Sequence, residues 1–254
     1  MKTIMAVVMF MLAPAVCFGQ DFCIFNKVYA GKNIAESVTI FKAGRVYDVL
    51  TEPAEVTIFD PPGNRFVILD TTRKVKTEVT FDQIEGFCQR VRAEALATND
   101  PLAKFLSEPT FQEAFDDAAG ELTLTNDWLV YQVKTALPKH DTMATQFVSY
   151  INWQTKLNAV ARPGALPPYP RIKLNDALGK LGRLPVEVQV TRYSAPPARK
   201  PVTLRSEHRV QAVILASDQV KIDEADRHLA TFATVSMLEY QRREQPAAET
   251  ARAK

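Results

Sequence analysis

Short apolar runs rich in Val, Ile, Phe, Tyr and Thr follow one another between residues 36 and 81, and turn signals separate them. The turn signals are Ala43-Gly44, Pro53-Ala54, Pro61-Pro62-Gly63-Asn64 and Thr71-Thr72. Runs of this length between such signals are typical of antiparallel strands joined by hairpins. We therefore expect a meander over this segment, preceded by another strand at residues 22–29.

The lengths of the turns determine which residues should pair. A two-residue turn in the first hairpin pairs Val38 with Val49, and a two-residue turn in the second pairs Val49 with Ile58. A four-residue loop in the third hairpin pairs Asp60 with Arg65 as a closing ion pair. Because side chains alternate between the two faces of a strand, one face should collect eight apolar residues. These are Val38, Ile40, Tyr47, Val49, Val56, Ile58, Val67 and Leu69.

The opposite face of the meander is apolar as well. Its members are Phe41, Val46, Leu50, Phe59, Phe66 and Ile68. A sheet with one face in water would alternate apolar with polar residues, so both faces of this sheet must be covered. Helices can cover one face. The eight residues of the other face either form a packed, barrel-like core or line a cavity for an apolar ligand, and the pattern leaves both alternatives open.

Helix signals follow the meander. Thr80 and Gln83 form a capping box, and Thr110 and Glu113 form a second one before a helix that should stop at Gly120. The remaining pattern predicts strands at 122–135, a long helix from 141, an extended passage at 163–170, strands from 185 and at 202–215, and a last helix between 224 and 243. This order indicates an α+β fold in which a large curved, half-barrel-like antiparallel sheet has helices packed on one face.

The N-terminus indicates export. Lys2 precedes an apolar run at residues 4–16 and small residues up to Gly19, which is the order of a secretory signal peptide. The alternative is an uncleaved anchor, although the run is short for a bilayer. We expect a signal peptide at 1–19, a single α+β domain at 20–244, and a disordered polar tail at 245–254. The mature protein should be periplasmic or extracellular.

Export changes the interpretation of the cysteines. Cys17 would leave with the signal peptide, so Cys23 and Cys88 would remain as an even pair in an oxidising compartment. A Cys23–Cys88 disulfide would close a loop of about 65 residues and stabilise the fold by roughly 4 kcal/mol. The alternative is a pair of inert buried thiols.

Composition and motifs argue against several functions. The chain has 31 basic and 29 acidic residues, so no large field of one sign attracts nucleic acid. Its three histidines, His140, His208 and His228, do not have metal-ligand spacing, and neither a G-x-S-x-G elbow nor a P-loop occurs. We therefore predict no catalytic residues, no metal site, no cofactor and no enzymatic activity.

The meander with two apolar faces, the Asp60-Pro61-Pro62-Gly63-Asn64-Arg65-Phe66 hairpin, the helices that follow and the secretory start together resemble the LolA-like superfamily of lipoprotein carriers, which includes LppX and LprG. The resemblance implies an open half-barrel whose concave side is covered by helices and receives acyl chains. It implies no individual ligand contact, and the strand at 22–29 stands where the carriers have a helix.

Two functions remain open. The first is an exported binding protein that holds a lipid or an acylated ligand between its curved sheet and its helices. The eight apolar residues from Val38 to Leu69 would then face the ligand. The second is an envelope structural or protein-interaction domain with a fully packed core and no ligand.

Overall fold

The computed structural model describes residues 20–162, 164–194 and 200–242. The segment expected to be a signal peptide, residues 1–19, and the expected tail, residues 245–254, lie outside the described residues. None of the helices in the described ranges is both long enough and apolar enough to cross a membrane.

The described residues form one sheet of twelve strands, in the order β12-β6-β5-β4-β3-β2-β1-β11-β10-β9-β8-β7. The strands are β1 (Phe22–Ala30), β2 (Asn33–Lys42), β3 (Arg45–Leu50), β4 (Glu55–Asp60), β5 (Arg65–Asp70), β6 (Val75–Thr80), β7 (Gln112–Asp116), β8 (Glu121–Thr125), β9 (Leu129–Ala136), β10 (Leu184–Tyr193), β11 (Pro201–Gln211) and β12 (Ala233–Thr234). The helices are α1 (Phe81–Ala97), α2 (Pro101–Ser107), α3 (Thr142–Ala161), α4 (Tyr169–Leu181), α5 (Ala216–Thr231) and α6 (Met237–Gln241). Apart from the parallel β12–β6 pair, neighbouring strands are antiparallel.

The meander has the predicted register in two of the three hairpins for which pairings were predicted. Val38 pairs with Val49 in the first, and Asp60 pairs with Arg65 in the third. The second prediction was wrong, because Val49 pairs with Val56 and the turn spans residues 51–54. The register therefore differs by two residues from the one expected. Since the side-chain period of a strand is also two, every side chain keeps its predicted face.

The first capping box is present and the second is absent. The backbone N–H of Gln83 donates to Thr80 Oγ1 at 3.2 Å, and the N–H of Thr80 donates to Gln83 Oε1 at 2.9 Å. The helix predicted after Thr110 is instead strand β7, which pairs along its whole length with β8. Pairing with β8 satisfies the backbone hydrogen bonds of β7 and packs Phe115 against a core cluster. These tertiary contacts override the local helix signals at Thr110 and Glu113.

Other element boundaries also differ. Helix α2 and the start of α4 occupy segments for which no helix was expected. Helix α4 ends at Gly182, which has the left-handed conformation at φ 63°. The last predicted helix is divided: α5 begins at Ala216 and α6 is separate. Asp218 starts α5 by accepting a hydrogen bond from the N–H of Leu215 at 3.1 Å.

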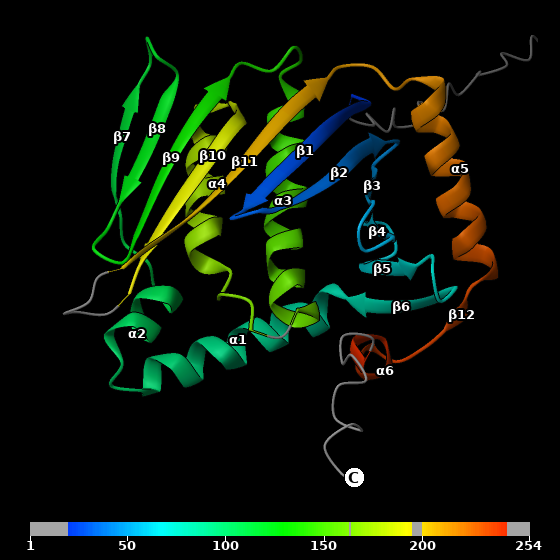
Figure 1. The fold of residues 1–254 in the computed structure, drawn as a ribbon, viewed down its shortest axis with the longest axis horizontal. Coiled ribbons are helices and arrows are strands. Elements are labelled where there is room, and N and C mark those ends of the chain that lie inside the picture. Colours follow the sequence, from blue (N-terminus) through cyan, green and yellow to red (C-terminus); the bar gives the residue numbers. More distant parts are fainter. Residues whose placement is uncertain (1–19, 163, 195–199, 243–254) are drawn as a thin grey trace, which may run out of the picture.

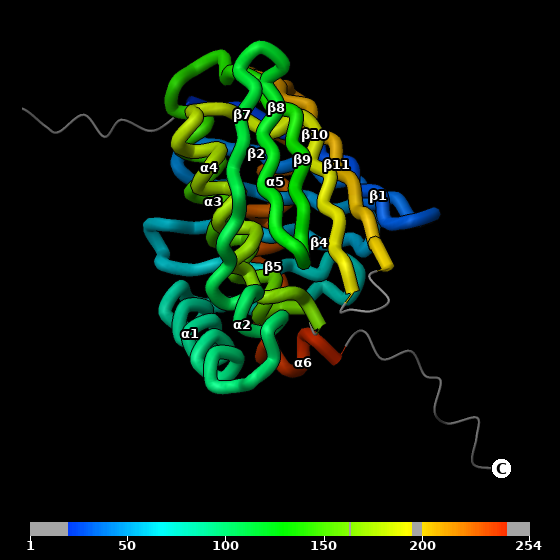
Figure 2. Tube along the Cα trace, turned by 90° about the vertical axis from the view of Figure 1, so that its left-hand side faces the viewer, coloured from blue at the N-terminus to red at the C-terminus, as the bar shows by residue number. Residues whose placement is uncertain are grey.

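The curved sheet and the α+β class are confirmed, and the sheet is not closed into a barrel because β7 and β12 lie at its two edges. Figure 1 shows α3 and α4 behind the sheet and α5 beside its other half, and Figure 2 shows α1, α3 and α4 together on one side. The expectation that helices cover one face holds for α1, α3 and α4. Helix α5 departs from it, because Ile222 and Ala225 pack on the opposite face.

Three apolar clusters fill the space between these layers. One joins the meander to α1 and α3, a second joins β8–β10 to α2 and α4, and the third lies under α5. Successive residues of β1 enter different clusters: Phe22 and Ile24 belong to the first, and Cys23 belongs to the third. Both faces of the meander are thus covered, as its sequence pattern requires.

Candidate functional site

The eight apolar residues predicted to face a ligand share one face of the sheet, and α5 covers them. Val38, Ile40, Tyr47, Val56, Ile58, Val67 and Leu69 are buried in the cluster that includes Ile222 and Ala225, and Val49 packs against it. The phenol of Tyr47 donates a hydrogen bond to Asp226 Oδ1 of α5 at 3.1 Å. These side chains therefore contribute to a helix-on-sheet core, the simpler of the two alternatives for this face.

Cys23 and Cys88 are free, so the disulfide hypothesis was wrong and the alternative of two buried thiols is correct. Cys23 lies under α5, where its Sγ donates to Asp218 Oδ2 at 3.7 Å, and Cys88 lies in the cluster on the opposite face of the sheet. Burial, together with nearby Asp218, raises the pKa of Cys23 to about 12. Burial raises that of Cys88 to about 11.

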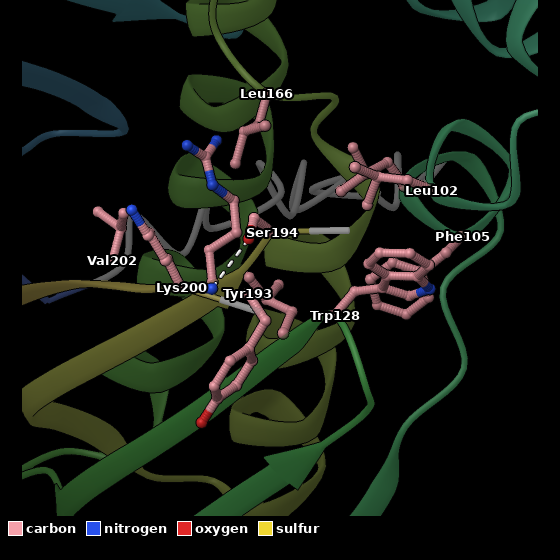
Figure 3. A pocket seen from close by; sticks show the side chains of 11 residues that line it. Leu102, Phe105, Trp128, Leu166, Tyr193, Ser194, Lys200 and Val202 are labelled. Carbon is pink, nitrogen blue, oxygen red and sulfur yellow. Dashed lines mark hydrogen bonds between the residues drawn. The ribbon is translucent and has the colours of Figure 1, made fainter. Parts of the chain in front are cut away.

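An apolar pocket of about 300 Å³ lies elsewhere, where α2 meets the ends of β9, β10 and β11 (Figure 3). Its lining is mainly aliphatic and aromatic, with two cationic residues. The residues are Leu102, Phe105, Leu106, Trp128, Leu129, Leu166, Arg192, Tyr193, Ser194, Lys200 and Val202. Phe105, Leu106 and Leu129 also belong to the cluster of α2, α4 and β8–β10, so the inner wall of the pocket is part of the core.

The outer wall of this pocket leaves apolar surface in water. Leu166 is 43% exposed and Val202 is 52% exposed, although both line the pocket. A concave apolar surface that stays exposed is a characteristic of a binding site, whereas single exposed apolar residues are ordinary. Arg192 and Lys200, both exposed, add positive charge to the same lining.

Backbone hydrogen bonds hold the strand ends that form the pocket. The N–H of Tyr193 donates to the carbonyl of Trp128 at 3.0 Å, which ties β10 to the residue before β9. The N–H of Ser194 donates to the carbonyl of Lys200 at 3.2 Å, and the N–H of Lys200 donates to Ser194 Oγ at 2.9 Å (Figure 3). The pocket is therefore preformed by paired backbone.

Sequence reasoning missed this pocket because its residues come from five separated segments and include a helix that was not predicted. One signal was available in the sequence: Val202 and Leu204 alternate with Thr203 and Arg205. In the structure this apolar face is left uncovered, because Val202 is 52% exposed and Leu204 is 42% exposed. Only the tertiary structure shows that the helices do not cover Val202 and Leu204.

The sheet carries a second hollow, of about 650 Å³, on the face opposite α4. Most of its charged side chains are paired: Lys27 pairs with Glu36 at 2.9 Å, Lys134 pairs with Glu187 at 3.3 Å, and the neighbouring Arg205 pairs with Glu187 and Glu207. Hydrogen bonds from Arg205 and Lys134 lower the pKa of Glu187. The guanidinium of Arg209 lies over the Phe25 ring.

On the helix-facing side, a row of hydrogen-bonded polar side chains crosses four strands. Ser206 Oγ lies 2.9 Å from His208 Nε2, and His208 Nδ1 lies 2.9 Å from Asn26 Oδ1. Asn26 donates to Thr39 Oγ1 at 2.8 Å, and Thr39 donates to Asp48 Oδ1 at 2.7 Å. Burial raises the pKa of Asp48. We call these five residues the polar row.

The serine, imidazole and amide of the polar row have the order of a nucleophile, a base and an orienting group. Burial, with the nearby Arg171 guanidinium, lowers the pKa of His208 to about 4. Such an imidazole is a weak base near neutral pH, where general bases have pKa values close to the working pH. The absence of enzymatic activity stays a prediction. Within the described ranges, no group of three or more His, Cys, Asp or Glu residues could hold a metal ion.

Comparison with known proteins adds no assignment: no protein-family model matches the chain, and no curated protein matches it either.

Proposed function

We propose that this protein binds a single-chain amphiphile, such as a fatty acid or an acylated peptide, in the pocket between α2 and the ends of β9–β11. The observation that carries the proposal is the pocket itself, which is concave, preformed, lined by Leu, Phe, Trp and Val, and open to solvent. Its volume of about 300 Å³ is at the lower end of the range of roughly 300–1,000 Å³ for ligand sites, which favours one acyl chain over a two-chain lipid.

The charges of the lining favour an anionic head group. Arg192 and Lys200 are exposed, and no ion pair holds either of them among the described residues. A carboxylate at the mouth of the pocket would gain their attraction, while its chain would remove Leu166 and Val202 from water.

The proposal moves the ligand from the face that was expected. The eight residues from Val38 to Leu69 lie under α5, whereas the pocket is on the side of α2 and α4. The resemblance to LolA-like carriers implies that acyl chains enter on the helix-covered side of a half-barrel, and the proposed pocket is on that side. Export of the mature protein remains part of the proposal.

The test is a titration of the mature chain, residues 20–254, with palmitate, followed by the fluorescence of Trp128 in a Trp153→Phe background. We expect saturable binding that Val202→Glu weakens at least tenfold, because a carboxylate would stand in the apolar wall. Val186→Glu is the matched control: Val186 is also an exposed strand valine, but it lies outside the pocket.

The second candidate, a structural or interaction domain, is favoured by the filled cluster beneath α5. Failure of the wild-type chain to take up palmitate or lysophospholipid would support that function. Equal affinities of the two glutamate variants would show that binding occurs away from this pocket.

A further inference from the structure

Three exposed apolar side chains lie within residues 213–220, where β11 leads into α5. Val213 is 60% exposed, Leu215 is 50% exposed, and Val220 of α5 is 54% exposed. Single exposed apolar residues are ordinary, whereas a group of them is typical of a surface that contacts another protein or a membrane. We call these three residues the β11–α5 patch.

Leu215 departs from a local rule of helix formation. It is the N-cap residue of α5, and its side chain makes no capping hydrogen bond. Ser, Thr, Asp and Asn are strongly preferred at this position because their side chains accept a hydrogen bond from the first turn. A leucine here is unfavourable for the helix and is also half in water, so it contributes little to the fold. Such local departures are expected where a residue serves function.

The fold holds the patch in a defined position. Ile214, between two patch residues, packs against the cluster under α5. The amide of Gln211 donates to the carbonyl of Val213 at 2.8 Å, and the N–H of Leu215 donates to Asp218 Oδ2 at 3.1 Å. The exposure of Val213 and Leu215 therefore belongs to an ordered connection rather than to a frayed segment.

The chain enters the fold beside this patch. Cys23 of β1 pairs with Gln211, and its Sγ lies 3.7 Å from Asp218 Oδ2. Figure 1 shows the start of β1 and the connection from β11 to α5 at the same end of the molecule. The apolar run at residues 4–16 is joined to this end through residues 17–22, which span about 20 Å at most.

This position favours a bilayer as the partner of the patch. The run at residues 4–16, inserted as a signal peptide or as an anchor, would bring the patch to the membrane surface. Two lysines at this end are already paired, Lys42 with Asp21 at 2.6 Å and Lys221 with Asp218 at 3.4 Å. Attraction to anionic lipids would thus add little, and contact would depend on the burial of apolar side chains.

We propose that the β11–α5 patch is a contact surface for the apolar region of a lipid bilayer, and that the mature protein keeps this surface. The contact is hydrophobic, so it needs no anionic lipid and is insensitive to salt. The proposal does not rest on the binding of an amphiphile, because none of the three patch residues lines the pocket at α2.

The test is flotation of the mature chain, residues 20–254, with phosphatidylcholine vesicles at increasing lipid concentration. Leu215→Ser removes an apolar side chain from the patch and supplies the capping hydroxyl that α5 lacks. Leu238→Ser is the matched control: Leu238 is 63% exposed, and it belongs to α6, at the other end of the molecule in Figure 1. Thermal unfolding of the three proteins is measured without lipid.

We expect wild type and Leu238→Ser to bind the vesicles alike, and the partition coefficient of Leu215→Ser to be at least fivefold lower. Leu215→Ser should nevertheless unfold at the same temperature as wild type or at a higher one, which separates the loss of membrane contact from a loss of structure. Added salt, or the inclusion of phosphatidylglycerol in the vesicles, should leave the wild-type partition coefficient unchanged.

Three results would overturn the proposal. The first is a wild-type chain that does not float with the vesicles at any lipid concentration. The second is a partition coefficient of Leu215→Ser equal to that of wild type. The third is a dimer of wild type, seen by sedimentation without lipid, that Leu215→Ser abolishes, which would assign the patch to a second copy of the chain. None of these results bears on the uptake of palmitate by the pocket, so the two proposals can fail separately.

Discussion

Asp60 accepts hydrogen bonds from two arginines on the strands that flank it in space and in sequence. Its Oδ1 lies 3.0 Å from Arg45 Nε, and its Oδ2 lies 3.5 Å from Arg65 Nε. The carboxylate side chain is 6% exposed, whereas those of the arginines are 42% and 34% exposed. One buried acid therefore joins β3, β4 and β5 at the end of the third hairpin.

We expect Asp60→Asn to destabilise the fold by roughly 1–3 kcal/mol, because Arg45 and Arg65 would lose the carboxylate that they share. The loss should be moderate because both guanidinium groups can still reach water. Urea unfolding measures the change. Asp21→Asn is the control: the Asp21–Lys42 pair is well exposed on both sides, and its loss should cost less than about 1 kcal/mol. A smaller loss for Asp60→Asn than for Asp21→Asn would contradict this role.

The cluster under α5 should respond to truncation as a packed core does. Ile58 of β4 is 1% exposed and Ile222 of α5 is 4% exposed, and both belong to this cluster. We expect Ile58→Ala and Ile222→Ala each to reduce the free energy of unfolding by about 2–5 kcal/mol. Val202→Ala, at an exposed site, should change it by less than about 0.5 kcal/mol. Near-wild-type stability of Ile58→Ala would show that this face encloses unfilled space.

The two cysteines should stay reduced in the folded protein, because they are on opposite faces of the sheet. We expect intact mass to be unchanged by reductant, and both thiols to be alkylated once the chain is unfolded. In the folded state their reaction at pH 8 should be slow, since burial raises the pKa of both. A species two mass units lighter without reductant, and lost upon reduction, would rule out this arrangement.

Stability should fall in acid as His208 takes up a proton. The ordinary pKa is 6.5 and that of the folded state is about 4, so an unfolded chain is protonated first as the pH drops. The lowered pKa of His208 therefore contributes about 3 kcal/mol to the free energy of unfolding. This contribution is complete above pH 6.5 and is lost as the pH falls from 6.5 to 4. His208→Gln should lack this part of the pH dependence. Asp48, whose raised pKa acts in the opposite sense, is present in both proteins. Parallel curves for the two proteins would refute the assignment to His208.

The meander was predictable because its information is local. Alternation assigns Val38 and Ile58 to the same face whatever the rest of the chain does, and the capping residues Thr80 and Gln83 are three positions apart. The error in the second hairpin was one of turn length, and it preserved the faces because it equals one side-chain period. The error at Thr110 shows the limit, since the same capping pattern begins a strand when a neighbouring strand satisfies its backbone.

The candidate site was not predictable because it depends on contacts between distant segments. The pocket needs α2, β9 and the β10–β11 strand ends in one place. No motif marks this set, because each residue type is ordinary in its own segment.

The sequence by itself determined the strands of the meander, the apolar character of both their faces and the requirement that both be covered, because side-chain alternation and turn chemistry act over a few residues. The tertiary structure decided that α5 fills the face reserved for a ligand, that the cysteines are separated by the sheet, and that an apolar pocket opens at α2. These outcomes depend on which apolar surfaces of distant segments pack against one another. That packing is determined by the contacts of the whole chain and not by any local pattern.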